Sequence, residues 1–394
     1  MKGPSTLVVD QWIKTAITAE LVRGAIELDA IPEGVRPHRL PAWARAQSDF
    51  PQLMLAEAQT SGVRVSFRTS ATAIELETRP TKLRYAGLPP RTDGVYDLLI
   101  DGELFTQATV DGGNTLFVDI RTMTPELQTG APGVAHFADL REGVKDVEIW
   151  LPHNEATELL GLRTNAPVEP LPSRRRVWLH HGSSISHGSD AAHPTGIWPA
   201  VAALAAEVEL INLGFGGNAL LDQFTARVIR DTPADVISIK VGINVVNHDA
   251  MRLRAFGPAV HGFLDTIREG HPTTPLLLVS PILCPMHEDT PGPSKPDIDA
   301  LKEGRVRFVA DGDPADIPSG KLTLGVIRDQ LARIAHQRAA TDSNLHYLDG
   351  RTLYGEADLA DLPLPDDLHP DADAHRLMGE RFAAFAFAES GALA

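Results

Sequence analysis

Residues 177–188 read Val-Trp-Leu-His-His-Gly-Ser-Ser-Ile-Ser-His-Gly and join an apolar run to a serine-rich turn. The run is short, largely apolar and ends at Gly182, as expected of a buried strand. Glycines at both ends of the turn allow a tight bend that presents Ser184 at the end of the strand. Taken alone, the turn also fits a helix cap or a phosphate-binding loop. The chain has no G-x-S-x-G motif, so the nucleophile elbow of α/β-hydrolases is absent.

Strand and helix patterns alternate from this point to the end of the chain. We predict strands at the apolar runs 177–181, 209–213, 236–241, 275–280 and 345–348. We predict helices over residues 198–207, 220–230, 258–269, 322–340 and 371–389. Apolar strands separated by helices indicate a parallel sheet that is covered on both faces. Active sites in such sheets lie beyond the carboxyl ends of the strands.

The chain before residue 170 follows a different pattern. Residues 63–68, Val-Arg-Val-Ser-Phe-Arg, alternate apolar and polar side chains, and further strands are predicted over 73–77, 97–100, 114–121 and 145–151. Many short strands with little helical periodicity indicate an antiparallel, jelly-roll-like β-sandwich. We place a boundary at the arginine-rich segment 171–176, interpreted as a solvated linker. This gives a sandwich domain over 1–170, with a helical or irregular N-terminal segment, and a second domain over 171–394.

Composition excludes several classes of protein. The chain has 394 residues, of which 43% are hydrophobic and 22% charged, which is typical of a folded protein. A formal net charge of −16 argues against binding to nucleic acid or to anionic lipid. The single cysteine, Cys284, cannot form an intrachain disulfide. No apolar run approaches the roughly 20 residues that span a bilayer, and the N-terminus has no signal-like apolar stretch. We therefore expect a cytoplasmic protein.

A second motif, Asp366-Asp367-Leu368-His369-Pro370, precedes the last predicted helix. A hydrolytic serine needs a base, and the base needs a carboxylate that orients it, so Asp366 and His369 are candidates for these roles. Asp190 and His193 have the same spacing but lie in the connection that carries Ser184. We favour the 366/369 pair because it belongs to a separate segment that can fold over the serine. Alternatively, Asp366 or Asp367 only caps the following helix.

Two further strand ends carry donors for an oxyanion. Residues 212–218, Asn-Leu-Gly-Phe-Gly-Gly-Asn, follow the second strand, and Gly242-Ile243-Asn244 follows the third. The backbone N–H groups of Ser184 and Gly217 and the amide of Asn244 can together surround one oxygen and need no metal to do so. Taken separately, each segment could be an ordinary turn, because Gly-Gly and Gly-x-Asn sequences are common in loops. Their coincidence at successive strand ends favours a site for acyl transfer.

These blocks together resemble the SGNH (GDSL-type) hydrolases, with Ser184, Gly217, Asn244 and His369 in the family's order and Asp366 completing a triad. The resemblance covers residues 175–390 and implies a flavodoxin-like three-layer α/β/α domain. The chain departs from the family at Ser183, where Asp is common, and at Val245, where many members have Asp. The segment 212–218 and the turn 182–186 are similar to those of a bacterial subgroup with an N-terminal β-sandwich, as is Gly94-Val-Tyr-Asp-Leu98.

The resemblance implies ester hydrolysis through an acyl-serine formed on Ser184, without a cofactor. We expect short-chain acyl esters, above all acetyl esters, with carbohydrates as one class of substrate. His187, Asn218 and Val245 are candidates for the substrate pocket. Two alternatives stay open: an acyltransferase that uses the same triad, and a non-catalytic carbohydrate-binding or interaction protein. The resemblance also suggests that the sandwich binds sugar or forms contacts in a homo-oligomer.

Other features carry weaker signals. The histidines around the serine (His180, His181, His187 and His193) suggest a metal, but adjacent residues of a strand point to opposite faces, and no H-E-x-x-H is present. We therefore expect pocket or core histidines and no metal. Three tryptophans, Trp12, Trp43 and Trp150, are either sugar platforms or buried residues. The proline-rich segment 284–320 is predicted to be a long loop that overhangs the active-site rim, or else an inert surface insertion.

Overall fold

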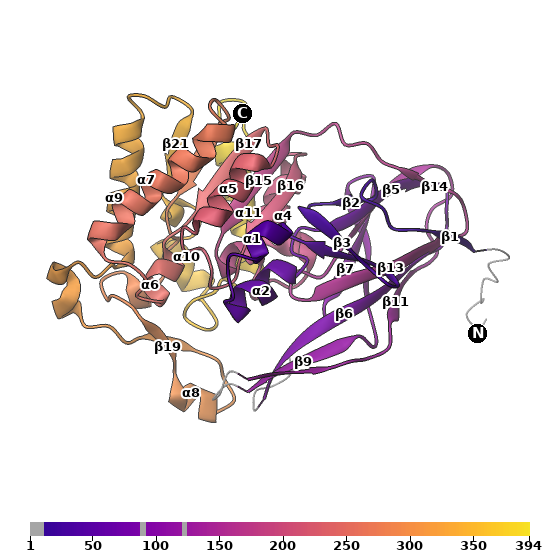
Figure 1. The fold of residues 1–394 in the computed structure, drawn as a ribbon, viewed down its shortest axis with the longest axis horizontal. Helices are drawn as coiled ribbons and strands as arrows, with labels where there is room; N and C mark the ends of the chain where they lie inside the picture. Colours follow the sequence, from indigo (N-terminus) through magenta and orange to yellow (C-terminus); the bar gives the residue numbers. More distant parts are fainter. Residues whose placement is uncertain (1–11, 87–91, 120–123) are drawn as a thin grey trace.

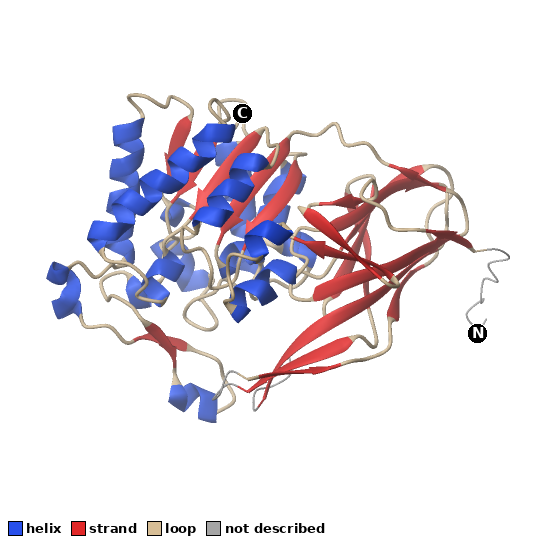
Figure 2. Ribbon diagram, in the orientation of Figure 1, coloured by secondary structure: helices blue, strands red, loops and turns tan. Residues whose placement is uncertain are grey.

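The computed structural model describes residues 12–86, 92–119 and 124–394. Antiparallel sheets formed before residue 171 lie beside a parallel sheet with helices, formed after it (Figures 1 and 2). We call the described residues before 171 the N-terminal part and the residues from 171 onward the C-terminal part. None of the described helices is long and apolar enough to cross a membrane.

Two sheets form the sandwich of the N-terminal part. One has the strand order β10-β9-β6-β13-β4-β3, with β1 beside β13 and β11 beside β6; the other has the order β14-β5-β12-β7-β8, with β2 beside β5. Paired strands are antiparallel except β6 and β9, which are parallel. The bounds are β1 (Ile13–Thr15), β2 (Val22–Arg23), β3 (Glu27–Ile31), β4 (Gly34–His38), β5 (Arg64–Thr69), β6 (Ile74–Ala86), β7 (Val95–Ile100), β8 (Glu103–Thr109), β9 (Asn114–Asp119), β10 (Pro125–Gln128), β11 (Gly133–Phe137), β12 (Lys145–Trp150), β13 (Ala156–Thr164) and β14 (Val168–Pro170).

A hydrophobic core fills the space between the two sheets. Phe67 and Ile149 from one sheet and Leu76 and Leu162 from the other are fully buried in it. The predicted strands correspond to β5, β6, β7, β9 and β12, which confirms the antiparallel sandwich. Residues 120 and 121 of the strand predicted over 114–121 lie outside the described residues. The prediction missed β3, β4, β8, β11 and β13, because long-range pairing rather than a clear local alternation makes them strands.

The C-terminal part is built on a parallel sheet with the order β16-β15-β17-β18-β21. Its strands are β15 (Val177–Gly182), β16 (Glu209–Gly214), β17 (Val236–Lys240), β18 (Leu276–Val279) and β21 (Leu345–Leu348). The order is that of flavodoxin-like folds, in which the chain reverses direction across the sheet between β15 and β17. The predicted parallel sheet is confirmed strand by strand.

Helices cover both faces of this sheet (Figure 2). On one face, α5, α7 and α9 bury Phe224, Phe263 and Ile327. On the other face, α4 and α11 bury Trp198 and Phe382, and the indole of Trp178 stacks on Phe382 with ring centroids 5.0 Å apart. The bounds are α3 (Ser184–His187), α4 (Trp198–Ala205), α5 (Gln223–Asp231), α6 (Ile243–Asn247), α7 (Leu253–Gly270), α9 (Leu324–Arg338), α10 (Glu356–Asp361) and α11 (Ala372–Ala386), with short 3-10 turns at Pro194–Gly196 and Gly350–Thr352.

Helix ends are mostly as the sequence indicated. Thr323 caps α9 and Asp371 caps α11, each through a side-chain oxygen that accepts a backbone N–H. The helix predicted to begin at Pro258 begins instead at Leu253, so that Pro258 lies inside α7 near its start. A proline so close to the first turn removes a single backbone hydrogen bond, which the apolar face of the helix outweighs.

The segment 284–320 contains more regular structure than the predicted loop. A hairpin of β19 (Ser294–Pro296) and β20 (Phe308–Ala310) holds the helix α8 (Ile298–Lys302) between its strands, and 3-10 turns at Pro285–His287 and Pro314–Ser319 flank it. Asp297 caps α8 by accepting from the N–H groups of Asp299 and Ala300. These elements are too short to produce a periodic sequence pattern.

Two helices of the N-terminal part, α1 (Ala42–Arg45) and α2 (Pro51–Ala58), pack on the C-terminal part. Leu40, Leu53 and Ala56 belong to the same hydrophobic core as β17 and α7. The fully buried guanidinium of Arg39 donates from Nη1 to the carbonyl oxygens of Asn212 (3.0 Å) and Gly214 (2.6 Å). Packing therefore crosses the predicted boundary at 170/171 and reaches the end of β16.

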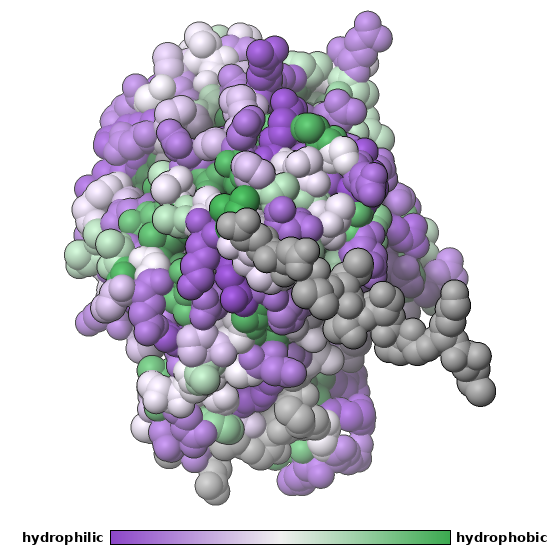
Figure 3. Space-filling view, turned by 90° about the vertical axis from the view of Figure 1, so that its right-hand side faces the viewer, coloured by the Kyte–Doolittle hydropathy of each residue, from purple (hydrophilic) through white to green (hydrophobic). Residues whose placement is uncertain are grey.

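The outer face of the sandwich mixes hydrophilic and hydrophobic side chains without one dominant apolar area (Figure 3). On the edge strand β8, the exposed apolar residues Leu104 and Phe105 stand beside the exposed polar residues Glu103 and Gln107. The site described below lies on the opposite side of the sandwich, where it meets the parallel sheet.

Candidate active site

Ser184 is the first residue of α3 and follows β15 directly. Gly182 allows this sharp junction, because a Cβ at that position would lie 2.3 Å from the Ser186 hydroxyl oxygen. Ser184 is half-buried at the carboxyl end of the parallel sheet. The turn thus holds its hydroxyl where the sequence predicted it.

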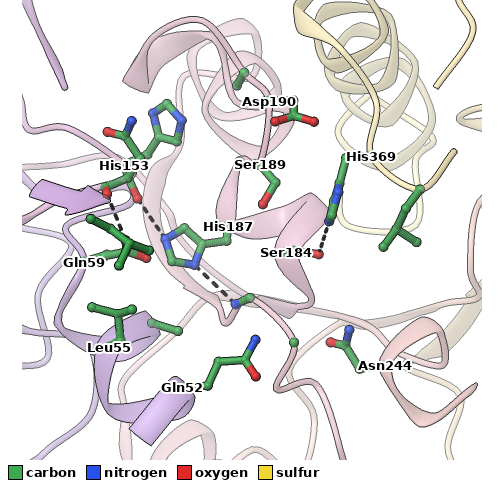
Figure 4. A pocket seen from close by; sticks show the side chains of 18 of the residues that line it. Gln52, Leu55, Gln59, His153, Ser184, His187, Ser189, Asp190, Asn244 and His369 are labelled. Carbon is green, nitrogen blue, oxygen red and sulfur yellow. Dashed lines mark hydrogen bonds between the residues drawn. The ribbon is translucent and has the colours of Figure 1, made fainter. Parts of the chain in front are cut away.

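The side chains of Ser184, His369 and Asp366 form a continuous hydrogen-bonded chain (Figure 4 shows its first link). Ser184 Oγ lies 2.8 Å from His369 Nε2, and His369 Nδ1 lies 2.6 Å from Asp366 Oδ2. In the arrangement that activates a serine, Nδ1–H donates to the carboxylate and Nε2 accepts from the hydroxyl. Figure 4 shows the imidazole of His369 pointing at the hydroxyl of Ser184.

Asp366 is held in its orientation by backbone groups. Its Oδ1 accepts from the N–H groups of Leu368 (2.9 Å) and His369 (2.6 Å). Burial alone would raise the pKa of Asp366, but its bond to His369, the imidazolium charge and these N–H groups outweigh it and lower the pKa below its usual value. The following helix is capped by Asp371, not by Asp366 or Asp367. Asp366 is thus a deeply placed carboxylate that remains ionised.

The competing pair, Asp190 and His193, does not form a second base for Ser184. His193 Nδ1 lies 2.7 Å from Oδ2 of Asp97, a fully buried residue of β7, which also accepts from the hydroxyl (2.6 Å) and N–H (2.9 Å) of Thr195. Asp190 lies instead at the mouth of the cavity beside His369. The imidazole of His193 therefore fastens the segment after α3 to the sandwich.

The oxyanion candidates lie around Ser184. Gly217 adopts a φ of +74°, a conformation that favours glycine. Asn244 Oδ1 accepts from the N–H of Ala219 at 3.0 Å, so the Nδ2 donor of the amide is left to face the cavity that Asn244 lines. Within the described residues, no hydrogen bond occupies the N–H groups of Ser184 and Gly217. These three groups therefore stay the candidate donors for a developing oxyanion.

A cavity of about 460 Å³ opens above Ser184, between the two parts of the chain. Of the predicted pocket residues, His187 lines it, whereas Asn218 and Val245 are not among the described residues of its wall. Asn218 folds back onto the carbonyl of Gly216, and Val245 is fully buried in the hydrophobic core. Val245 follows Asn244 on α6, and a helix turns successive side chains by about 100°, so the two face different ways.

The histidines near Ser184 do not converge. His180 lies 2.7 Å from the hydroxyl of Ser238 and 2.8 Å from that of Ser186 on one face of the sheet. His181 lies on the other face, where its Nδ1 lies 2.8 Å from the carbonyl of Leu213 and its ring stacks on Phe263. Burial lowers the pKa of both imidazoles, that of His181 to about 4. Both residues are thus neutral core histidines.

One group of described residues has metal-ligand geometry: Asp190, Asp366 and His369 each place one ligand atom within 4.8 Å of the others. Two of the three are already bonded to each other within the Ser184 chain. The close spacing therefore follows from the pairing of His369 with its carboxylate, and it gives no reason to expect an ion.

Sequence reasoning missed the contribution of the N-terminal part to the cavity wall. The helix α2 and its C-terminal end contribute Gln52, Leu55, Ala56 and Gln59, and the β12–β13 turn contributes His153. No local pattern could have found these residues, because only long-range packing brings them to Ser184. The predicted tryptophan platforms lie elsewhere: Trp150 is buried, and neither Trp12 nor Trp43 lines the cavity.

The segment 284–320 does reach the rim, as predicted. Ser294 and Phe308 line the cavity, and the Phe308 ring meets the His369 ring edge-on with centroids 6.1 Å apart. The N–H of Phe308 donates to the carbonyl of Asp366 at 3.0 Å, and Arg307 Nε donates to the carboxylate of Asp367 at 2.6 Å. The hairpin therefore packs against the segment that carries His369 and holds it by hydrogen bonds.

Comparison with known proteins agrees with this architecture. The family model for the GDSL-like lipase/acylhydrolase family matches residues 181–377. A second family model, the N-terminal domain of SsfX3, matches residues 21–159. No curated protein sequence is significantly similar to the chain.

Several solved structures share both parts of the fold. The salicylyl-acyltransferase SsfX3 from a tetracycline biosynthetic pathway is 28% identical over 94% of this chain and 95% of its own, with a TM-score of 0.76. An active-site mutant of a family two carbohydrate esterase from Clostridium thermocellum is 13% identical, with coverage of 95% and 97% and a TM-score of 0.56. The acetyl xylan esterase Est2A from Butyrivibrio proteoclasticus is 11% identical, with coverage of 95% and 96% and a TM-score of 0.51.

Proposed function

The chain belongs to the GDSL-like lipase/acylhydrolase family, and on that premise we propose that it is a serine esterase that hydrolyses short-chain acyl esters through an acyl-serine on Ser184. The observation that carries the proposal is the hydrogen-bonded chain from Ser184 through His369 to Asp366, with links of 2.8 Å and 2.6 Å. Serine, imidazole and carboxylate in that order are the groups that acyl transfer through a serine requires.

The proposed reaction has two half-reactions. Ser184 Oγ attacks the ester carbonyl carbon while His369 Nε2 accepts its proton, and the carbonyl oxygen becomes an oxyanion bound by Ser184 N–H, Gly217 N–H and Asn244 Nδ2. The carbon–oxygen bond to the alcohol then breaks, and His369 returns the proton to the departing oxygen. In the second half, His369 accepts a proton from water, which attacks the acyl carbon; the bond to Ser184 Oγ then breaks, His369 returns the proton to Oγ, and the carboxylic acid is released. Asp366 stabilises the imidazolium in both halves.

The lining of the cavity supports an uncharged, polar alcohol as the other half of the ester. Its described residues carry mostly amide, hydroxyl and imidazole groups, such as Gln52, Asn154, Asn247 and His248, together with the carboxylate of Asp190. Amides and hydroxyls both donate and accept hydrogen bonds, as sugar hydroxyls require. The net charge of −16 repels anionic substrates. Acetylated carbohydrates are therefore the substrate class that we propose first.

A second candidate function is acyl transfer to an alcohol instead of water. It is supported by the likeness to the salicylyl-acyltransferase, which is 28% identical and covered over nearly its whole length. The protein groups needed for the two reactions are the same, because only the nucleophile that attacks the acyl-serine differs.

The test is a product analysis of the purified protein with p-nitrophenyl acetate and peracetylated xylose, with and without an added alcohol such as glycerol. An esterase releases acetate at the same rate as the alcohol of the substrate, and adding glycerol forms little glyceryl acetate. Predominant transfer to glycerol would support the acyltransferase instead. Turnover by Ser184→Ala equal to that of the unmodified protein would contradict both.

A further inference from the structure

The two ends of an ester must lie on different sides of Ser184. His369 Nε2, which lies 2.8 Å from Ser184 Oγ, also has to reach the alcohol oxygen in order to protonate it. The alcohol therefore leaves on the side of His369, where Phe308 packs against the imidazole ring. The oxyanion faces the three proposed donors, the N–H groups of Ser184 and Gly217 and the amide of Asn244. The remaining substituent of the ester carbonyl carbon is the acyl chain, which therefore points away from His369.

The side of Ser184 away from His369 is formed mainly by the N-terminal part. Figure 4 shows His369 on one side of Ser184, and Leu55, Gln59, His153 and His187 on the other. Four of the residues on this wall, Gln52, Leu55, Ala56 and Gln59, come from α2 and its C-terminal end. These four residues belong to a segment more than 100 residues before Ser184 in the sequence.

Two glycines lie between Ser184 and this wall. A Cβ at Gly216 would lie 3.8 Å from the Ser184 Cβ and 3.7 Å from the His187 ring, and would therefore project between them. A Cβ at Gly217 would lie 2.5 Å from Nε2 of Gln52, so α2 packs directly against the oxyanion segment. Ser184, Gly217 and residues of α2 line the same cavity, so the helix faces an acyl group that is attached to Ser184.

The wall carries no carboxylate, ammonium or guanidinium group among these residues: Gln52 and Gln59 contribute amides, and Leu55 and Ala56 contribute apolar groups. Leu55 is half-buried and Ala56 is buried, and both line the cavity. His187 accepts from the N–H of Gly216 at Nδ1 (3.3 Å), so its Nε2 carries the proton and donates to the carbonyl of His153 at 2.8 Å. Both ring nitrogens of His187 thus face backbone groups, and the residue lines the cavity.

We infer that α2 forms the acyl-binding subsite, that Leu55 sets the size of the acyl group, and that the subsite takes small, uncharged acyl groups. This inference rests on the proposed function, because it assigns one half of the proposed ester to one wall. By the same geometry, Phe308 of the 284–320 insertion contacts the alcohol half.

The experiment uses two series of esters with the full-length protein. The acyl series keeps the p-nitrophenol leaving group and varies the acid from acetate to butyrate and hexanoate; the alcohol series keeps acetate and varies the alcohol between p-nitrophenol, phenol and 1-naphthol. Leu55→Trp is expected to lower kcat/KM for the butyrate relative to the acetate by about tenfold or more, and Leu55→Ala to raise that ratio. Relative rates in the alcohol series should stay within about twofold, the small change expected when no contact with the alcohol is altered.

Two control variants accompany the Leu55 pair. Phe50→Ala, at the exposed aromatic before α2 that does not line the cavity, should leave both series unchanged. Phe308→Ala should change the alcohol series but not the ratio of butyrate to acetate. Circular dichroism and the thermal midpoint show whether each variant is folded.

The outcomes separate this inference from the proposed function. Hydrolysis that is undiminished in Ser184→Ala would overturn the proposed function itself. Hydrolysis that depends on Ser184, together with an unchanged ratio of butyrate to acetate in both folded Leu55 variants, would overturn only the assignment of α2. A shift of that ratio by Phe308→Ala and not by the Leu55 variants would place the acyl group on the opposite side.

Discussion

His369 Nε2 lies 2.8 Å from Ser184 Oγ, although the two residues are 185 positions apart in the sequence. One is held by the turn after β15, and the other by a segment whose backbone is tied to β20 through the bond between Phe308 N–H and Asp366. The proposed chemistry depends on this contact, and most of the predictions below vary the groups that maintain it.

Asn244→Asp tests the oxyanion assignment. The side-chain oxygen that accepts from Ala219 N–H is kept, while the donor that faces the cavity is replaced by a second carboxylate oxygen. We expect kcat to fall by at least about 100- to 1,000-fold, the cost of one oxyanion donor, with little change in KM. Asn344→Ala, which precedes β21 at the opposite edge of the sheet, is the control. A loss of less than threefold in Asn244→Asp would remove this residue from the site.

Asp366→Asn tests the support of the base. Asparagine fits the two backbone N–H donors of Leu368 and His369 but cannot stabilise an imidazolium, so kcat should fall by roughly 1,000-fold or more. Because the pKa of Asp366 is held below its usual value, the carboxylate stays ionised as the pH falls. Loss of activity in acid should therefore follow one ionisation, that of the general base and not that of Asp366. Initial rates over a range of pH measure this, and a profile without an acid limb would contradict His369 as the base.

Asp97→Ala tests the contact that fastens the segment after Ser184 to the sandwich. Removing the fully buried carboxylate leaves donors of His193 and Thr195 without their acceptor, and we expect a loss of about 3 kcal/mol in the free energy of unfolding. Asp231→Ala, which breaks an exposed ion pair with Arg230, should cost less than about 1 kcal/mol. Urea titration of both variants is the measurement, and equal losses would show that Asp97 has no special role.

Buried neutral histidines should make the fold sensitive to acid. Burial lowers the pKa of His181 and His375 from 6.5 to about 4, and that of His153 to about 3. Below pH 6.5 the unfolded chain therefore binds protons that the folded chain does not, so stability is full above this pH and declines as the pH falls to about 4 for His181 and His375 and to about 3 for His153. Each such histidine contributes on the order of 3 kcal/mol to the loss.

Replacing one of these histidines isolates its contribution to the acid-dependent loss of stability. In His181→Phe, the new ring would lie between Phe215 and Phe263. We expect this variant to lose less free energy of unfolding between pH 6.5 and 4.5 than the unmodified protein. The exposed His336 offers a matched control in His336→Gln, which should retain the full decline. The account of acid sensitivity is wrong if both variants have the same slope as the unmodified protein.

The sequence was sufficient for those parts of the fold and site that depend on local patterns. Apolar runs and glycine turns fix the ends of β15, β16 and β17, and the carboxyl ends of parallel strands necessarily meet at one edge. Ser184, Gly217 and Asn244 are therefore expected near one another from the sequence alone. The base required one further step, since only the combination of His369 with Asp366 in a separate segment distinguished it from His193.

What the sequence could not predict depends on contacts between distant segments. The bond between His193 and Asp97 joins β7 to the segment after α3, and neither residue's surroundings in the sequence indicate the other. The same is true of Gln52 and Gly217, which lie close together because α2 approaches the loop after β16. Val245 was misplaced for a simpler reason: being next to Asn244 in sequence does not put a residue on the same side of a helix.

The most direct test of the proposed acyl-serine is to identify the residue that becomes covalently modified. The protein is treated with a fluorophosphonate, and peptides are mapped by mass spectrometry alongside identically treated Ser184→Ala. The account predicts one phosphonyl group on Ser184 of the unmodified protein, parallel loss of esterase activity, and no labelling of the variant. Esterase activity that survives while Ser184 is fully labelled, or a label on a different residue, would contradict it.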